Sequence, residues 1–510
     1  MSQKNEYFIV IDAGTSGVKV GLGTSKGKIV HVVKTEWSYF SPEELDPYGV
    51  EFNPEEFWSK IILTIKEAIF ESDIDKNLIS CIAVTSQRHG CVFIDKNGKE
   101  LYSAPNRDAR GLEVDIDEYI NTDELYKITG LNPPFLFIPA RYLWFKENDE
   151  EKFNQIDKIL PIYSWIVYKL TNRSVIDVTT ASATQLLDLE KLTWSEKILD
   201  SINLPKSKLP DLVEIGSSLG TMTSEVSKLL GLRNNTIVTI SGADTQSAVL
   251  GTGFNDAGDI VIVAGSTMPI IQLIDTPIRD SEKKLWSGCF LESKKWLLEA
   301  NSGPAGIIIE WFVQTFLNQN SGTTTNPYNI METLATSHKP GSDDITMDLG
   351  IQIFNLNNMM DITASTIRFP SVIYSLDSNV NLGSFAHALD ENIAFAIRAN
   401  IEVLTQVSKL PVKNISIVGG LSKSRLLRKM LASVLNMNIK HIHSESTILG
   451  SLFACDLAKN YLQTYDEFFH LIKEEIDISE PNVDDIEIYN QYYRKWLENY
   501  KQQRKISDEF

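Results

Sequence analysis

The segment Ile9–Val20, "IVIDAGTSGVKV", joins two apolar runs through an aspartate and a short turn of glycine, threonine and serine. Apolar, β-branched runs separated by such a turn are typical of paired strands. A second segment, Ile260–Ile271, reads "IVIVAGSTMPII" and repeats the pattern, with valine in place of the acid. The copies lie about half a chain apart, which indicates two related halves. The acid is expected to serve a function that only one half needs.

The length of the chain supports this division. Single hydrophobic cores stop growing near about 250–300 residues, so 510 residues predict two large domains. The turn-rich segment "LGTGFNDAGD" places the boundary between residues 1–252 and 253–510. Because no low-complexity linker separates the halves, we expect two closely abutting domains with a hinged cleft.

Composition excludes several classes of protein. The formal net charge is -19, which argues against binding to nucleic acid or to an anionic membrane. There is no apolar run of about 18 residues, and the N-terminus lacks the pattern of a signal peptide. The four cysteines are scattered singly, without metal-ligand spacing. These features predict a cytoplasmic protein. The oligomeric state is not fixed, and a homodimer stays open.

Alternating strand and helix patterns predict an α/β fold. Asn53 and Pro54 are a helix start signal before a run with apolar spacing of three and four. The strands expected in the first half are residues 7–14, 17–23, 28–37 and 79–87, with a hairpin over 91–103. Helices are expected around 140–170, 184–202 and 384–407, and a strand, glycine pair and helix over 412–436.

The first turn has the chemistry of a phosphate site. Gly14 lets the backbone approach a ligand, Thr15 and Ser16 add hydroxyls, and exposed N–H groups in such a turn bind phosphate oxygens. Asp12 could hold Mg²⁺ through water, and Lys19 could reach a phosphate. A plain β-hairpin with a surface lysine explains the motif equally well.

Two further motifs resemble parts of an active site. Asp244 follows an apolar strand within "SGADTQSAVLGTG", where an acid at a strand's carboxyl end suits a general base. The alternative is an aspartate that caps the next helix. The second turn, Gly265-Ser266-Thr267, keeps the donors of the first turn, and could also be a simple loop.

A glycine pair marks the last third of the chain. Gly419 and Gly420 lie between a strand and a helix, in "GGLSKS", which ends at Ser424. The helix N-terminus favours phosphate, and the glycines would let an adenosine lie close. The spacing is neither that of the P-loop nor that of the dinucleotide fingerprint.

Together, the motifs resemble the FGGY carbohydrate kinases of the actin/Hsp70/hexokinase superfamily, from about Tyr7 to Leu462. Segments such as "LPDLVEIGSSLGTMT" and "ALDENIAFAIRANIEVL" are also similar to family blocks. The resemblance implies two ribonuclease-H-like (actin-like ATPase) domains closing over a cleft. It also implies ATP and Mg²⁺ as cofactors, and a small sugar or polyol as the acceptor.

The resemblance also implies residue roles. Asp12 matches the metal-associated acid, and Asp244 matches the catalytic base. The phosphate- and ATP-binding residues would be Gly14, Thr15, Ser16, Lys19, Gly265, Ser266, Thr267, Gly419, Gly420 and Ser424. Leu421 shortens the family's usual glycine run, which affects the purine contacts.

The acceptor is expected to contact Arg88, His89, Asp108, Asp244 and Gln246. Glycerol kinases have an Arg-Glu pair where this chain has Arg88-His89, and xylulose kinases usually have Met-His. Both tend to have a tryptophan just before the acid of the "PNRDARG" block, and this chain has none. Asp-Ala-Arg without that tryptophan, and Asp244-x-Gln246, are more similar to the autoinducer-2 kinases, which phosphorylate a compound derived from dihydroxypentanedione. A purely structural role for His89 stays open.

The resulting hypothesis is ATP-dependent phosphorylation of a hydroxyl group, with Asp244 as general base. Phosphoryl transfer requires mostly positioning and charge neutralisation, which the two turns and the acids could supply. Xylulose, another pentulose, or glycerol are the alternative acceptors. The non-enzyme alternative is an ATP-switched binding module like actin or Hsp70, against which the polar acceptor residues beside Asp244 argue.

Overall fold

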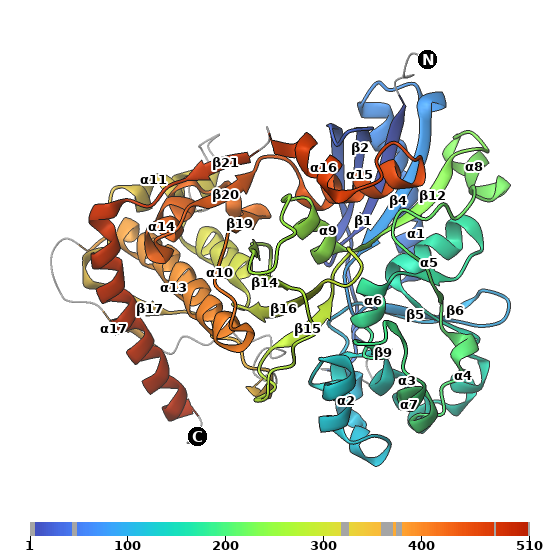
Figure 1. The fold of residues 1–510 in the computed structure, drawn as a ribbon, viewed down its shortest axis with the longest axis horizontal. Helices are drawn as coiled ribbons and strands as arrows, with labels where there is room; N and C mark the ends of the chain where they lie inside the picture. The colour runs from blue at the N-terminus through green and yellow to red at the C-terminus, as the bar shows by residue number, and fades with distance from the viewer. Residues whose placement is uncertain are drawn as a thin grey trace. The chain divides into compact units, whose positions relative to one another are not determined.

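The computed structural model describes residues 6–42, 48–317, 326–358, 371–373, 380–473 and 476–507. The chain divides into two compact units, and each is built from separate stretches. Unit 1 comprises Met1–Asn255, Ile274–Leu297 and Ser444–Glu474, and unit 2 comprises Asp256–Leu273, Leu298–His443 and Glu475–Phe510. Both units combine helices with β-sheet, as the α/β prediction expected (Figure 1).

Unit 1 is organised around a five-stranded sheet in the order β12-β4-β1-β2-β3. Its strands are β1 (Tyr7–Ala13), β2 (Gly17–Thr24), β3 (Ile29–Glu36), β4 (Ile79–Ser86) and β12 (Ile237–Ala243). β1, β2 and β3 pair antiparallel, whereas β4 pairs parallel to both β1 and β12. The predicted strands of the first half are therefore confirmed. The helix α1 (Pro54–Glu71) is also confirmed, because the Asn53 side chain caps its first turn.

The rest of unit 1 surrounds this sheet. A three-stranded sheet contains β5 (Cys91–Ile94), β6 (Glu100–Ala104) and β7 (Lys158–Pro161), and its β5–β6 hairpin is the predicted one. The short strands are β8 (Val175–Ile176), β9 (Leu187–Asp188), β10 (Thr193–Trp194), β11 (Asp211–Leu212) and β15 (Trp286–Cys289). The helices are α2 (Thr122–Thr129), α3 (Ile138–Asn148), α4 (Glu150–Gln155), α5 (Ile162–Thr171), α6 (Val178–Ser182), α7 (Glu196–Ser201), α8 (Ser224–Leu230), α9 (Asp244–Leu250), α15 (Ser446–Ala458) and α16 (Tyr465–Ile472).

The predicted helix over residues 184–202 is wrong. Gln185 and Leu192 adopt positive φ angles of 65° and 55°, which an α-helix does not accommodate. The segment instead forms the β9–β10 pair, and its helix, α7, covers only Glu196–Ser201. An apolar pattern alone does not detect such breaks, because neither residue is a glycine or a proline.

Helix α15 comes from the far end of the chain and packs on the main sheet of unit 1. Ile448 and Leu452 belong to the same buried cluster as Phe8 and Cys81 of the sheet. Gly21 of β2 lies under Ile448, where an added Cβ would come within 2.3 Å of a methyl group. This strand therefore needs a glycine to admit the helix.

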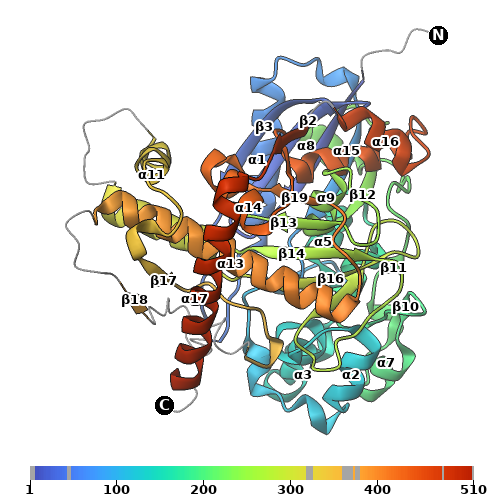
Figure 2. The ribbon, with the colours of Figure 1, turned by 60° about the vertical axis from the view of Figure 1, so that its left-hand side comes forward.

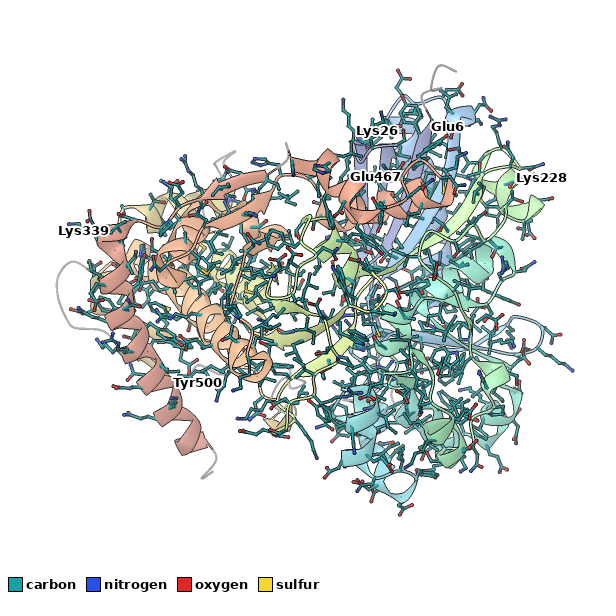
Figure 3. The ribbon with its side chains drawn as sticks, viewed as in Figure 1. Glu6, Lys26, Lys228, Lys339, Glu467 and Tyr500 are labelled. Atoms are coloured by element: carbon teal, nitrogen blue, oxygen red, sulfur yellow. The ribbon has the colours of Figure 1, made fainter. Side chains whose placement is uncertain are left out.

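The first and the last stretches of unit 1 contact each other at the start of β1. Glu6, labelled in Figure 3, accepts hydrogen bonds from Ser80 at 2.6 Å and from Tyr461 at 2.9 Å, and it pairs with Lys459 at 3.1 Å. These contacts hold the entry to β1 beside the end of α15.

The main sheet of unit 2 contains, in order, β16 (Trp296–Asn301), β14 (Pro269–Ile274), β13 (Ile260–Val263), β19 (Ile415–Val418), β20 (Ile439–Ile442) and β21 (Ile476–Ser479). β13 pairs antiparallel with β14 and parallel with β19, so the strand, turn and strand of unit 1 recur here. β17 (Thr346–Asp348) and β18 (Ser371–Ile373) form a separate pair.

The helices of unit 2 are α10 (Ala305–Phe312), α11 (Pro327–Thr336), α13 (Leu382–Ser408), α14 (Arg425–Leu435) and α17 (Val483–Ser507). α13 and α17 cross, as Figure 2 shows, and Trp496 donates a hydrogen bond to Asn392 at 2.9 Å where they meet. The long helix and the strand–glycine–helix segment were predicted and are confirmed. Residues 369–370 and 374–379, which precede α13, lie outside the described residues.

Gly450 supports a direct test of this packing. α9 and α15 contact through their backbones, and a Cβ at Gly450 would lie 2.0 Å from the carbonyl oxygen of Ser247. We expect Gly450→Ala to lower the free energy of unfolding by about 1–3 kcal/mol, as overpacking does. Urea unfolding would measure this. Gly288→Ala is the control, since its Cβ would meet only ordinary contacts from 3.4 Å. Equal stability of both variants would contradict the prediction.

Candidate active site

Three parallel strands of unit 1 end at the same edge of its sheet. Ala13 of β1 and Ala243 of β12 both pair with Ser86 of β4. Asp12 and Asp244 lie at the ends of the outer two of these strands. The carboxyl ends of parallel strands are where α/β proteins place ligands. The predicted metal-binding acid and the predicted base are therefore brought to one edge.

Asp12 is a buried carboxylate with an unsatisfied oxygen. Its side chain is 6% exposed, and its Oδ1 has no hydrogen-bond partner among the described residues. The pKa of Asp12 is raised to about 7, mainly by burial; Lys19 opposes this rise, and the negative charges of Asp244 and Glu445 add to it. A second, positive partner would relieve this electrostatic cost.

Lys19 is held by an acid that the sequence motifs did not reveal. Its Nζ forms an ion pair with Glu445 Oε2 at 2.8 Å, across 426 positions of the chain. Burial lowers the pKa of Lys19, but the carboxylates of Asp12 and Glu445 outweigh burial and raise it. None of the motifs in the sequence analysis includes Glu445.

These side chains suit a divalent cation. Mg²⁺ prefers carboxylate and water oxygens, and it is usually bound through one or two carboxylates with substrate phosphates. Asp12, Asp244 and Glu445 act on one another electrostatically, and the Asp12 oxygen without a partner is the group that a cation would satisfy. The donor set therefore fits Mg²⁺.

Neighbouring side chains donate hydrogen bonds to the backbone carbonyl groups of the turn after β1. The carbonyl oxygen of Thr15 accepts hydrogen bonds from Trp37 at 3.2 Å and from the Tyr39 hydroxyl. Gln87 donates to the carbonyl oxygen of Gly14 at 3.2 Å. Because the carbonyls are used in this way, the turn is rigid on one side. The sequence predicted the turn but not Gln87, which directly precedes the predicted substrate-binding residue Arg88.

The other side of this turn stays accessible. Ser16 is exposed, whereas Gly14 and Thr15 are half-buried. The amide of Gly14 donates to the carbonyl oxygen of Gly17 at 3.0 Å, which closes the turn tightly. Asn106 donates to the Thr15 hydroxyl at 3.2 Å.

Asp244 is the first residue of α9, and the N-cap position belongs to Ala243, which makes no side-chain cap. The Asp244 Oδ1 accepts the amide of Thr245 at 2.6 Å and its hydroxyl at 3.2 Å. The helix-cap alternative therefore does not describe its position. The carboxylate lies in the first turn, where the helix dipole favours negative charge.

His89 has an unused nitrogen in a buried position. It has φ of 67°, and its Nδ1 lies 2.9 Å from the carbonyl oxygen of Ala183, so Nδ1 carries the proton and donates. Burial lowers the pKa of His89 to about 3, with Arg88 contributing, so the ring is neutral. Within the described part of the chain, its Nε2 has no hydrogen-bond partner. The ring packs edge-on against Phe137, with centroids 5.1 Å apart, and near Trp286.

Gln246 offers a second unused group. The side chain is 1% exposed and donates to the carbonyl oxygen of Cys289 at 3.4 Å. Its Oε1 has no partner among the residues that the structure describes. His89 Nε2 and Gln246 Oε1 are thus two of several buried acceptor atoms in the described part of unit 1 that lack a partner, which costs free energy unless a ligand donates to them. Arg88, next to His89, is half-buried.

Asp108 is fully buried between cations. Its carboxylate accepts Arg110 at 3.0 Å and Tyr102 at 2.5 Å, and it lies 3.4 Å from Arg141. It also accepts the amide of Val50 at 2.9 Å. This network fixes the segment of chain that follows β6. The predicted contact of Asp108 with an acceptor stays a prediction.

In unit 2, the second turn repeats the first without the acid. Gly265 donates its amide to the carbonyl oxygen of Thr267 at 3.1 Å, and Ser266 and Thr267 are exposed. Gly306, in the first turn of α10, lies under this turn, since its Cβ would come within 2.3 Å of the Gly265 oxygen. Val263 takes the place of Asp12 and is half-buried.

The two glycines after β19 differ in what they require. Gly419 has φ of 93° and ψ of -173°, a region essentially restricted to glycine, and its Cβ would lie 2.7 Å from the Ala264 oxygen. No described atom lies within 4 Å of a Cβ at Gly420. The Gly419 backbone is thus fixed against the strand that leads to the second turn, whereas Gly420 is open.

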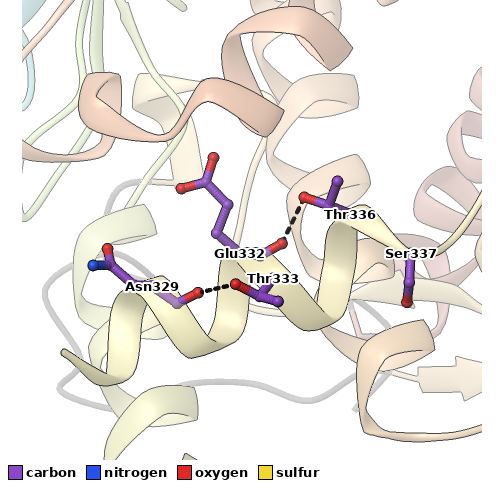
Figure 4. A pocket seen from close by; sticks show the side chains of 5 residues that line it. All are labelled: Asn329, Glu332, Thr333, Thr336 and Ser337. Carbon is purple, nitrogen blue, oxygen red and sulfur yellow. Dashed lines mark hydrogen bonds between the residues drawn. The ribbon is translucent and has the colours of Figure 1, made fainter. Parts of the chain in front are cut away.

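The N-terminus of α14 is already bound by side chains. Ser424 Oγ accepts the amide of Leu427 at 3.1 Å, and Glu332 of α11 accepts the amide of Leu426 at 2.9 Å. A carboxylate therefore occupies the end of the helix where the sequence suggested a phosphate. Glu332 also lines a pocket of about 590 Å³ with Asn329, Thr333, Thr336 and Ser337 (Figure 4).

Comparisons with known proteins identify the family of this chain. Residues 7–251 match the model "FGGY family of carbohydrate kinases, N-terminal domain", and residues 260–458 match the C-terminal domain of the same family. The chain is 28% identical to a Bacillus subtilis protein named "Putative sugar kinase YoaC", over 97% of this chain and 96% of that one. It is 24% identical to the autoinducer-2 kinase of Escherichia coli, over 100% of this chain and 96% of the relative.

A solved structure shows the same fold. The ligand-bound xylulose kinase from Lactobacillus acidophilus aligns with a TM-score of 0.82 at 22% identity, over 97% of each chain. The predicted two-domain, actin-like architecture is confirmed by this likeness. No helix in the described part of the chain is both long and apolar enough to span a membrane.

The buried Asp12 should make stability depend on pH. Its pKa is about 7 in the folded protein against a reference of 3.8, so the folded state binds its proton more tightly. The free energy of unfolding therefore falls as pH rises from about 4 to 7, and the cost persists above pH 7. Asp12→Asn cannot ionise, so its stability relative to wild type should increase between pH 5 and pH 8.

Urea unfolding at both pH values would measure this difference, with and without Mg²⁺. At pH 8, we expect Mg²⁺ to stabilise the wild type and to have little effect on Asp12→Asn, because the ion would satisfy the Asp12 carboxylate. Parallel pH profiles for the two proteins, or equal stabilisation by Mg²⁺, would contradict the prediction.

Proposed function

Since the chain belongs to the FGGY family of carbohydrate kinases and is an ATP-dependent sugar kinase, we propose that Asp244 is the base that activates the acceptor hydroxyl group. The observation that carries this proposal is the convergence of Asp12 and Asp244 on one sheet edge, with Lys19 and Glu445 beside them. Family membership also confirms the expectation of an enzyme over that of an ATP-switched binding module.

Transfer would proceed by attack of the acceptor oxygen on the γ-phosphorus of ATP. As the new O–P bond forms, the hydroxyl proton passes to the Asp244 carboxylate, and ADP leaves with the electrons of the broken bond. Asp244 suits this role because it is the first residue of α9, at the sheet edge where β1 and β12 end, and its Oδ1 is oriented by the amide and the hydroxyl of Thr245.

The remaining roles follow from the turns. We assign Gly14, Thr15, Ser16 and Lys19 in unit 1 to phosphate binding, and Gly265, Ser266 and Thr267 in unit 2 to the same task. Gly419, Gly420 and Ser424 are assigned to the adenosine side, beside the Glu332 pocket. Asp12 would hold Mg²⁺, which neutralises phosphate charge when bound.

We assign His89 and Gln246 to binding of the sugar or polyol substrate. A neutral imidazole whose Nδ1 is occupied presents Nε2 as an acceptor, and Gln246 Oε1 is a second acceptor. Both are suited to hydroxyl groups, which donate, and a polyhydroxylated substrate would satisfy both. We assign Arg88 to contacts with oxygen atoms of the substrate, and we assign Asp108 to the same substrate-binding site.

For the substrate, we favour the phosphorylation of a dihydroxypentanedione-derived compound, as in autoinducer-2 kinases. The support is the Asp-Ala-Arg block without a preceding tryptophan, the Asp244-x-Gln246 pattern, and full-length similarity to a relative with that name. Xylulose, another pentulose, or glycerol is the second candidate, since a ligand-bound xylulose kinase shares the fold.

Two wider proposals accompany the activity. The related halves divide at residues 1–252 and 253–510, close to the gap between the two family matches. The enzyme acts in the cytoplasm, where ATP is available; the cysteines at positions 81, 91, 289 and 455 are buried thiols without disulfides in the described structure.

Replacement of the base is the central test. Asp244→Asn should lower kcat by about 10²–10⁴-fold, because the amide cannot take the proton, while ATP still binds. Steady-state kinetics and isothermal titration with ATP would separate the two effects. The control is Asp211→Asn, which changes an exposed aspartate on β11 and should leave kcat unaltered. Near-wild-type turnover of Asp244→Asn would refute the assignment.

A kinase screen identifies the acceptor. Purified enzyme with ATP and Mg²⁺ would be tested against the dihydroxypentanedione compound, xylulose, ribulose, erythrulose and glycerol. We expect the first to give the highest kcat/KM by at least about tenfold, which corresponds to about 1.4 kcal/mol of transition-state discrimination. A higher kcat/KM for xylulose or glycerol would replace the favoured substrate and leave the role of Asp244 intact.

A further inference from the structure

Two histidines and an aspartate lie together in unit 2, on the pair of strands that ends its sheet. His441 of β20 is directly opposite Asp477 of β21 in the antiparallel register. His443 is the first residue after β20. One potential ligand atom from each of the three side chains lies within 4.8 Å of the other two.

His441 has an unsatisfied nitrogen in this cluster. Its side chain is 5% exposed, and its Nδ1 has no hydrogen-bond partner within the described ranges. The His443 ring stands at 90° to it, with centroids 5.1 Å apart. A buried polar atom without a partner is costly, which indicates that a missing group completes the site. His443 is exposed, so the cluster is open to solvent.

The aspartate is already oriented by an arginine. Arg428 of α14 places Nη2 3.5 Å from Asp477 Oδ2, and its Nη1 donates to the carbonyl oxygen of Ser422 at 2.6 Å. The other oxygen, Oδ1, accepts the amide of Ile478 at 2.9 Å, and each carboxylate oxygen keeps a second lone pair that can bind a metal ion. Carboxylates that bind metals are commonly held by such an outer hydrogen-bonding partner. Arg428 and Lys423 also bring positive charge, which sets a limit on affinity for a cation.

We propose that His441, His443 and Asp477 bind a divalent transition-metal ion of the Zn²⁺ type. Imidazole nitrogens with one carboxylate suit Zn²⁺, Ni²⁺ or Cu²⁺, whereas Mg²⁺ prefers oxygen ligands alone. Three protein ligands leave a fourth tetrahedral position for water. The three residues belong to unit 2, whereas Asp12 belongs to unit 1, and the proposal does not depend on the proposed phosphoryl transfer.

Zn²⁺ itself is the probe. Full-length, tag-free protein, freed of metal by a chelator, would be titrated with Zn²⁺ by calorimetry in buffer with excess Mg²⁺. We expect one tight equivalent, and at least about tenfold weaker binding in His443→Ala and in Asp477→Asn. Both positions are at least partly exposed, so neither change leaves a cavity in the core.

His31→Ala is the matched control. His31 forms another histidine–carboxylate contact, with Glu71 at 3.0 Å, on the surface of unit 1. It should bind Zn²⁺ as the wild type does. Thermal unfolding of the metal-free variants verifies that they are folded. Absence of tight binding in the wild type, or unchanged binding in both His443→Ala and Asp477→Asn, would overturn the proposal. An equal loss in His31→Ala would do the same.

Discussion

Parallel pairing of β1, β4 and β12 is the constraint on which the site in unit 1 depends. It brings strands that are distant in sequence into one register, so that Ala13 and Ala243 both face Ser86. Their carboxyl ends then meet at one edge, and the side chains that follow are positioned without further machinery. One hydrogen bond, from the Thr85 hydroxyl to the Gly242 carbonyl oxygen at 2.7 Å, fixes the same edge from within the sheet.

Electrostatics gives that edge its character. Three carboxylates and a lysine lie close together, and the buried Asp12 is not neutralised by Lys19 alone, because Lys19 is paired with Glu445. A site left with surplus negative charge attracts a cation, and the cation in turn attracts phosphates. The second turn has Val263 in place of the acid, which fits a duplication in which only one copy needs to hold the metal.

Much of the fold and of the candidate site could be predicted where the sequence signal lies in neighbouring residues. Strand and helix patterns located the main sheets, the Asn53 cap and the Gly419 turn. The signal failed where it was not local. Glu445 approaches Lys19 from 426 positions away, and nothing in its neighbourhood distinguishes it from a surface acid. The 184–202 segment has a helical apolar pattern, but residues with left-handed backbone angles interrupt it. The neutral state of His89 and its unpaired Nε2 likewise depend on packing against Phe137 and on the hydrogen bond to Ala183.

The return of α15 to unit 1 has a consequence for synthesis of the protein. Phe8 and Cys81 are made early, but Ile448 and Leu452, which share their buried cluster, are made near the end. At a translation rate of about 5–20 residues per second, roughly tens of seconds pass between the synthesis of this face of the sheet and the synthesis of α15, which covers it. During that interval, the nascent chain exposes apolar surface of the kind that chaperones bind. The first half of the chain therefore cannot complete its core until the second half has been translated.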